Sequence, residues 1–190
     1  MERLSATGQA TRRASPFTPE DVGSIAGRRG WFPPGDAHAD LEPAAMGRQQ
    51  WLAEAAQLLG AQASDSGALE VLLERIFQYD ARENLARPEN QAVMAREGAR
   101  QVLRELASLV LDSRDVDSDR YKEIVTALKE RTGRRGQELF HPVRLALAGR
   151  AGEGDLDRVI LLLDRAARLP WSVAVKSCRE RIIEFCAAID

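Results

Sequence analysis

The sequence predicts an all-α fold, a bundle or cage of about seven helices preceded by a disordered N-terminal tail. From about residue 45 onward, apolar residues recur every three or four positions, the spacing of one helix face. No segment alternates apolar and polar residues with the period of two that a half-buried strand shows. Aromatic residues make up only 5% of the chain, which argues against an all-β protein.

The first three helices follow from apolar stripes and the residues that bound them. A stripe over residues 51–59 is closed by Gly60, a residue type that commonly ends helices. Residues 69–77 hold apolar side chains at i, i+3, i+4, i+7 and i+8, the clearest helical pattern in the chain. Pro88 suits a first helical turn, and the apolar face that continues from there to Val110 predicts one long third helix.

Four further helices are expected over about residues 118–132, 138–148, 156–167 and 171–189. Residues that favour helix ends bound them, namely Asp117-Ser118-Asp119, Gly133, Gly149, Asp155 and Pro170. Seven helices joined by short turns can enclose a hydrophobic core.

The first 45 residues differ from the rest of the chain. Ser, Thr, Pro, Gly, Arg and Ala dominate them, and no helical or strand period is sustained. We therefore expect residues 1–45 to be a flexible tail, in which Trp31 and Phe32 can pack back onto the body. Residues 46–190 are expected to form the helical domain.

Composition excludes several classes of protein. No apolar run approaches the roughly 20 residues of a membrane span, and the net charge of −2 does not suit wholesale coating of nucleic acid. No nucleotide-binding glycine pattern occurs, and two cysteines and two histidines offer no metal or nucleophile motif. We predict no cofactor, no metal and no catalytic residue, with His141 more typical of a packing residue. Cys178 and Cys186 are expected to be reduced core residues in a cytoplasmic protein.

Charge is concentrated in one stretch. Residues 120–150 contain eight basic and three acidic side chains, an excess of five positive charges on a chain that is acidic elsewhere. Such a stripe is typical of a phosphate-binding surface, although ordinary surface arginines explain the charge alone equally well.

The order of residues within that stripe is more specific. The run from Thr132 to Arg150 reads TGRRGQELFHPVRLALAGR. It resembles a stretch near the end of bacterial glutamate–tRNA ligases, which are class I aminoacyl-tRNA synthetases. The family pattern is a Gly- and Lys/Arg-rich turn followed by Leu-Phe-x-Pro-(Val/Leu)-Arg-(Val/Leu)-Ala-Leu-Thr-Gly, and only its Thr is changed here, to Ala148. The resemblance is strongest over residues 95–168 and does not include the catalytic domain.

In that family the region is the second half of an all-helical anticodon-binding domain. The resemblance implies that Arg144 contacts anticodon bases and that the following loop contributes Glu153, Gly154 and Leu156. Arg134, Arg135 and Arg150 of the basic stripe complete the expected RNA-binding set. Arg144 has a second interpretation, as a half-buried residue that bonds loop carbonyls.

We therefore expect a tRNA-binding module that acts in or alongside aminoacylation and is not an enzyme on its own. Its partners would be the anticodon loop of a tRNA, most simply glutamate tRNA, and a separate catalytic subunit. The alternative is a helical protein–protein interaction or regulatory module that kept the scaffold and lost RNA binding. Glu153 and Asp155 favour this alternative, because they stand where the family loop is uncharged and carboxylates repel phosphate.

Overall fold

The computed structural model describes residues 15–33, 43–111, 118–152 and 156–189, and within these ranges every regular element is a helix. The predicted all-α class is confirmed. The helices are α1 (Pro19–Arg28), α2 (Pro43–Gly60), α3 (Ser66–Phe77), α4 (Ala81–Ala86), α5 (Pro88–Met94), α6 (Ala99–Leu111), α7 (Ser118–Thr132), α8 (Gly136–Ala148), α9 (Leu156–Arg168) and α10 (Cys178–Ile189).

The described residues form ten helices rather than about seven, for three reasons. The helix α1 lies within the predicted tail. The short α4 is an addition, started by Asp80, whose side chain accepts the N–H of Glu83 at 2.9 Å. The expected long third helix is divided into α5 and α6, because Gly98 between them has a φ of +81°, a left-handed conformation that no α-helix can continue.

Residues 15–33 of the expected flexible tail form a capped helix that packs on the body, whereas residues 1–14 and 34–42 lie outside the described residues. Thr18 caps the start of α1, with its side chain accepting the N–H of Asp21 and the Asp21 carboxylate accepting the N–H of Thr18. Val22, Ile25 and Ala26 are buried where α1 packs on α2. These three apolar residues are too few to form a recognisable helical pattern in an otherwise polar segment. The stability of α1 comes from its packing on a neighbouring helix, which the local sequence does not reveal.

An aromatic cluster joins this segment to the core. Trp31 is only 1% exposed and stacks on Phe77 with ring centroids 4.1 Å apart. Trp51 and Trp171 present their rings to Phe77 at steep angles, at 5.6 and 5.0 Å. The partly buried Phe32 lies 5.9 Å from Trp171, so both aromatic residues of the predicted tail pack onto the body as expected.

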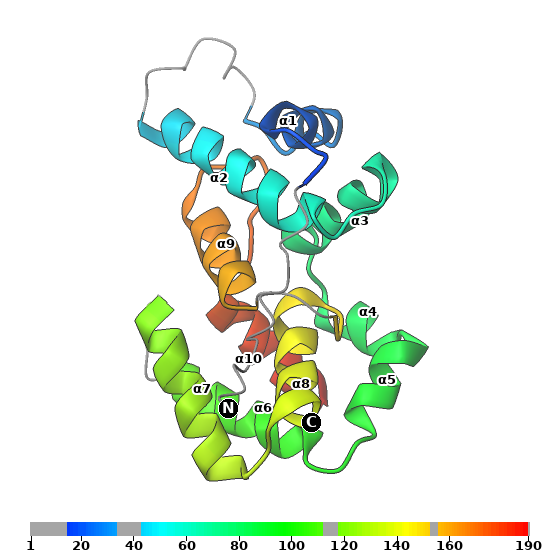
Figure 1. Cartoon of the computed structure of the whole chain (residues 1–190), viewed down its shortest axis with the longest axis vertical. Coiled ribbons are helices and arrows are strands. Elements are labelled where there is room, and N and C mark those ends of the chain that lie inside the picture. Colours follow the sequence, from blue (N-terminus) through cyan, green and yellow to red (C-terminus); the bar gives the residue numbers. More distant parts are fainter. Residues whose placement is uncertain (1–14, 34–42, 112–117, 153–155, 190) are drawn as a thin grey trace, which may run out of the picture.

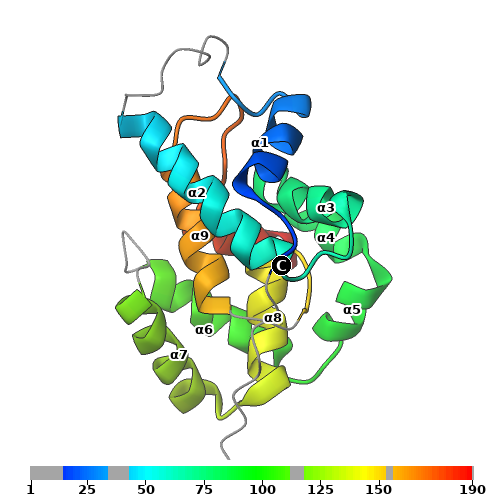
Figure 2. The ribbon, with the colours of Figure 1, turned by 45° about the horizontal axis from the view of Figure 1, so that its top comes forward.

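The helices form two groups connected through α9 and α10 (Figure 1). One end of the molecule contains α1, α2 and α3, and α9 packs beneath α2. The other end contains α4 to α8, and α10 packs against α4, α6 and α8. The C-terminal end of α8 points towards the first group (Figures 1 and 2). The meeting point of the two groups is therefore formed by the ends of several helices.

Candidate nucleic-acid interface

The end of α8 carries Arg144, the central residue of the predicted site. The helix stops at Gly149, whose φ of +70° lets its N–H donate back to the carbonyl of Leu145 at 3.0 Å. Arg144 is half-buried, and its Nη1 donates to the carbonyl of Gly152 at 2.7 Å. The side chain therefore holds the loop that follows α8, as its second interpretation requires, but it also borders a cavity.

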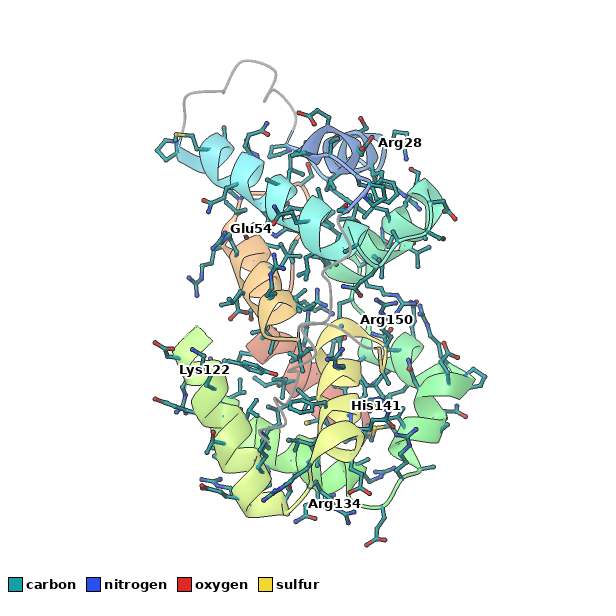
Figure 3. The ribbon with its side chains drawn as sticks, viewed as in Figure 1. Arg28, Glu54, Lys122, Arg134, His141 and Arg150 are labelled. Carbon is teal, nitrogen blue, oxygen red and sulfur yellow. The ribbon has the colours of Figure 1, made fainter. Side chains whose placement is uncertain are left out.

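This cavity, of about 50 Å³, lies where α2, α3, α8 and α9 meet. Its walls are largely apolar, formed by Leu59, Leu72, Ile76, Leu156, Val159 and Leu163. Four arginines also line it: Arg75 from α3, Arg144 from α8, Arg150 from the loop after α8, and Arg181 from α10. Figure 3 shows Arg150 at the end of α8 that faces α2 and α3. The cavity thus combines apolar walls with a rim of guanidinium groups.

Two hydrogen bonds of this rim go to neutral acceptors. Arg144 donates to the carbonyl of Gly152, and Arg150 donates from Nη2 to Gln62 Oε1 at 2.5 Å. In Arg75, Nε and Nη1 are buried and have no hydrogen-bond acceptor among the described residues. A buried donor without an acceptor costs free energy, so these two atoms are energetically unfavourable as they stand.

The arginines also act on one another. Burial, and after it the positive charge of Arg144, lowers the pKa of Arg150. Burial again comes first for Arg75, whose pKa is lowered further by the charges of Arg150 and Arg87. Guanidinium groups remain protonated at neutral pH. The cavity rim therefore concentrates positive charge that a bound anion would neutralise.

A model of the anticodon binding domain family matches residues 36–169, more than half of the chain. The chain belongs to this family. The resemblance noted in the sequence is thereby confirmed, and the matched range contains Arg75, Arg144 and Arg150 of the cavity rim.

Two relatives of this anticodon-binding domain are glutamate–tRNA ligases. One, named glutamate–tRNA ligase 2, is from Syntrophus aciditrophicus and is 41% identical over 76 residues, which cover 40% of this chain and 16% of the ligase. The other is from Bacillus licheniformis and is 28% identical over 117 residues, which cover 62% of this chain and 24% of the ligase. The chain thus spans a quarter or less of the ligases it matches. No solved structure matches it.

Two of the predicted RNA-binding residues of the domain, Arg134 and Arg135, lie far from the cavity. They precede α8 and Arg150 follows it, so about 20 Å of helix separates them; Figure 3 shows Arg134 and Arg150 at opposite ends of α8. Arg134 bonds Glu97 at 3.4 Å and Glu138 at 3.3 Å, and its side chain packs over Gly98. Arg135 is exposed at the start of the helix. The structure therefore does not gather the predicted residues into one site.

The loop residues of the prediction are only partly described. Leu156, a predicted RNA contact, begins α9, is 5% exposed and lines the cavity. Glu153 and Gly154 lie outside the described residues, as does the predicted capping residue Asp155.

Two residues of the anticodon-binding domain's cavity were missed by the sequence analysis, Arg75 and Arg181. Their helices are recognised by their apolar stripes, but nothing in the sequence analysis singles out either arginine. A signal exists for Arg181, because it falls at i+3 in the otherwise apolar series Cys178, Ile182 and Phe185. An arginine at a core position of a helix indicates a buried, bonded cation.

Among the described residues, His141 and the acidic side chains form no metal site. Nη1 of Arg96 lies 3.0 Å from Nδ1 of His141, and because a guanidinium can only donate, that ring nitrogen accepts. Within the described ranges, no three His, Cys, Asp or Glu side chains are grouped as a metal site would require. No helix in this part of the chain is long and apolar enough to cross a membrane.

Proposed function

We propose that this anticodon-binding domain binds the anticodon loop of a tRNA, with the arginine-rimmed cavity as the binding site. The observation that carries the proposal is that Arg75, Arg144 and Arg150 border one cavity with apolar walls, while Nε and Nη1 of Arg75 are buried and lack an acceptor among the described residues. A folded domain rarely leaves buried donors unpaired, and ligand binding is one reason to do so.

The chemistry of the cavity suits an unstacked RNA base. Anticodon bases lie in a loop, so their edges and faces are accessible to protein side chains. Leu72 and Ile76 of α3 and Val159 of α9 offer apolar surface to a base face. Arg75 supplies donors for the oxygen and nitrogen acceptors on a base edge, and Arg150 lies at the rim, where a backbone phosphate would pass.

In this proposal the residues predicted from the sequence have different roles. Arg144 orients the loop after α8 and contributes charge at the cavity, and Leu156 forms part of the wall. Arg134 and Arg135 contribute general electrostatic attraction from the far end of α8. The relatives' names support glutamate tRNA as the ligand. A separate catalytic subunit is the second partner in this proposal.

The test compares the binding of glutamate tRNA and an unrelated tRNA by filter retention or fluorescence anisotropy over a range of salt concentrations. We expect affinity to fall steeply with salt, because phosphate contacts release counterions. Arg144→Ala and Arg75→Met should each weaken binding by about 1–3 kcal/mol. Arg179→Ala, an exposed arginine on α10, is the matched control and should bind as wild type does.

Negligible retention of both tRNAs would refute the proposal. Co-purification of a protein partner without RNA, together with unchanged behaviour of Arg144→Ala, would establish the interaction module instead. Equal, salt-sensitive retention of both tRNAs would keep RNA binding but remove the selectivity for glutamate tRNA.

A further inference from the structure

The most deeply buried charge among the described residues is Arg181, near the start of α10. Its exposure is 0%, and its guanidinium lies 4.5 Å from the ring centroid of Tyr79. Four hydrogen bonds join it to backbone carbonyls: Nε to Lys176 at 2.9 Å, Nη1 to Arg75 at 3.0 Å and to Leu147 at 2.9 Å, and Nη2 to Ile76 at 2.6 Å. This cation therefore bonds protein backbone from three separate segments.

Three of these carbonyls belong to the ends of two helices. Arg75 and Ile76 lie in the last turn of α3, and Leu147 lies in the last turn of α8. The last carbonyls of a helix have no partner within the helix and carry the negative end of its dipole. One guanidinium thus caps both helices at once and fixes their ends relative to each other.

Only an arginine can make this arrangement. Its planar fork directs several N–H groups outward in fixed directions, whereas the ammonium of a lysine is a single point donor. Burial lowers the pKa of Arg181 to about 10, so the group still carries its charge at neutral pH. The Arg181 side chain also lies beyond residues 36–169, the part matched by the family.

We propose that Arg181 is a positioning residue for the RNA site, which sets the distance between Arg75 on α3 and the pair Arg144 and Arg150 at the end of α8. The link is direct, because Arg181 bonds the backbone carbonyl of Arg75, whose own guanidinium lines the cavity. It also bonds Leu147, which lies between Arg144 and Arg150 in the chain. The inference rests on the proposed binding of RNA at this cavity.

The test compares Arg181→Met and Arg181→Lys with Phe185→Leu. Phe185 is also wholly buried on α10, but it does not line the cavity, so it controls for a general loss of stability. With each variant shown to be folded by circular dichroism, we expect Arg181→Met to weaken tRNA binding by about tenfold, the size of one lost hydrogen bond to a charged group. Arg181→Lys should be intermediate, and Phe185→Leu should bind within about twofold of wild type.

A double-mutant cycle separates positioning from plain stability. Because Arg181 is proposed to act through Arg75, adding Arg75→Met to Arg181→Met should weaken binding by much less than Arg75→Met does alone. Full additivity of the two losses, or equal losses in Arg181→Met and Phe185→Leu, would overturn the proposal.

A second measurement does not depend on RNA and so distinguishes failure of this inference from failure of the proposed function. Hydrogen exchange should become faster in the last turns of α3 and α8 in Arg181→Met, and much less so in Phe185→Leu. If both variants show the same exchange in these turns, Arg181 does not position them, whether or not wild type binds tRNA.

Discussion

Replacing Trp31 with alanine tests whether residues 15–33 are an integral part of the fold. Trp31 is 1% exposed, and its ring stacks on Phe77 with the ring centroids 4.1 Å apart. The backbone carbonyl of Trp31 also accepts the N–H of Ser172 at 2.8 Å. A buried tryptophan removes roughly 150–250 Å² from water, which at about 25 cal/mol per Å² is an upper limit of about 4–6 kcal/mol.

The alanine side chain keeps a small part of this burial, and the core around Phe77 relaxes only partly into the space. We therefore expect Trp31→Ala to lower the free energy of unfolding by about 3–5 kcal/mol. That is a large share of the roughly 5–15 kcal/mol that stabilises a typical domain.

The assay is urea unfolding followed by far-ultraviolet circular dichroism, which does not depend on the fluorescence of the removed ring. Met46→Ala is the control, because that side chain is 66% exposed and its loss should change stability by no more than about 0.5 kcal/mol. A loss below about 1 kcal/mol for Trp31→Ala would refute the reasoning and show that α1 and Trp31 are peripheral to the core.

Three further predictions concern the cavity and its supports. Arg75→Met should raise the free energy of unfolding while it weakens tRNA binding, because it removes a half-buried charge, two of whose donor atoms lack acceptors among the described residues. A decrease in stability would show instead that Arg75 supports the fold. Gly149→Ala should destabilise the domain by about 1–2 kcal/mol in urea unfolding, because φ is +70° and the added Cβ would lie 2.7 Å from Asn84 Oδ1. Wild-type stability of this variant would contradict the expectation that only glycine fits this turn without strain. Hydrogen bonds from Arg29 hold the pKa of Glu70 below its usual range. The Glu70 carboxylate therefore stabilises the fold at pH values above its pKa in the unfolded chain, and this stabilisation is lost as the pH falls through its pKa in the folded protein. Glu70→Gln should accordingly be less stable than wild type at neutral pH and equal to it at strongly acidic pH, and a difference independent of pH would exclude the ion pair as its cause.

Local patterns were sufficient for most of the helices. The stripe at residues 69–77 became α3, and Gly133 and Gly149 end α7 and α8 with positive φ, as their positions predicted. These features depend on residues close together in the chain, so the sequence alone carries them. The last helix was placed too early, because Trp171 and Val175 pack on the core from a loop before Ser177 and Glu180 start α10.

The short elements could not be predicted in the same way. The helix α1 has three buried side chains and too few residues for a recognisable period. It forms because Trp31 reaches Phe77 and because Arg29 pairs with Glu70 at 2.6 Å, contacts between residues more than 40 positions apart. Packing of this kind outweighs local propensity, and no sequence window contains it.

The sequence by itself determined the helical class, most helix ends and the kinship with anticodon-binding domains, because these follow from side-chain periodicity and from one ordered run of residues. Only the tertiary structure decided which arginines share a site. It brings Arg75 to Arg144 and Arg150 through the buried Arg181, and it leaves Arg134 at the other end of α8. The physical reason is that a sequence shows which residues are charged but not which way their side chains point in the folded protein. Burial, helix ends and the bonds of each guanidinium decide where it points.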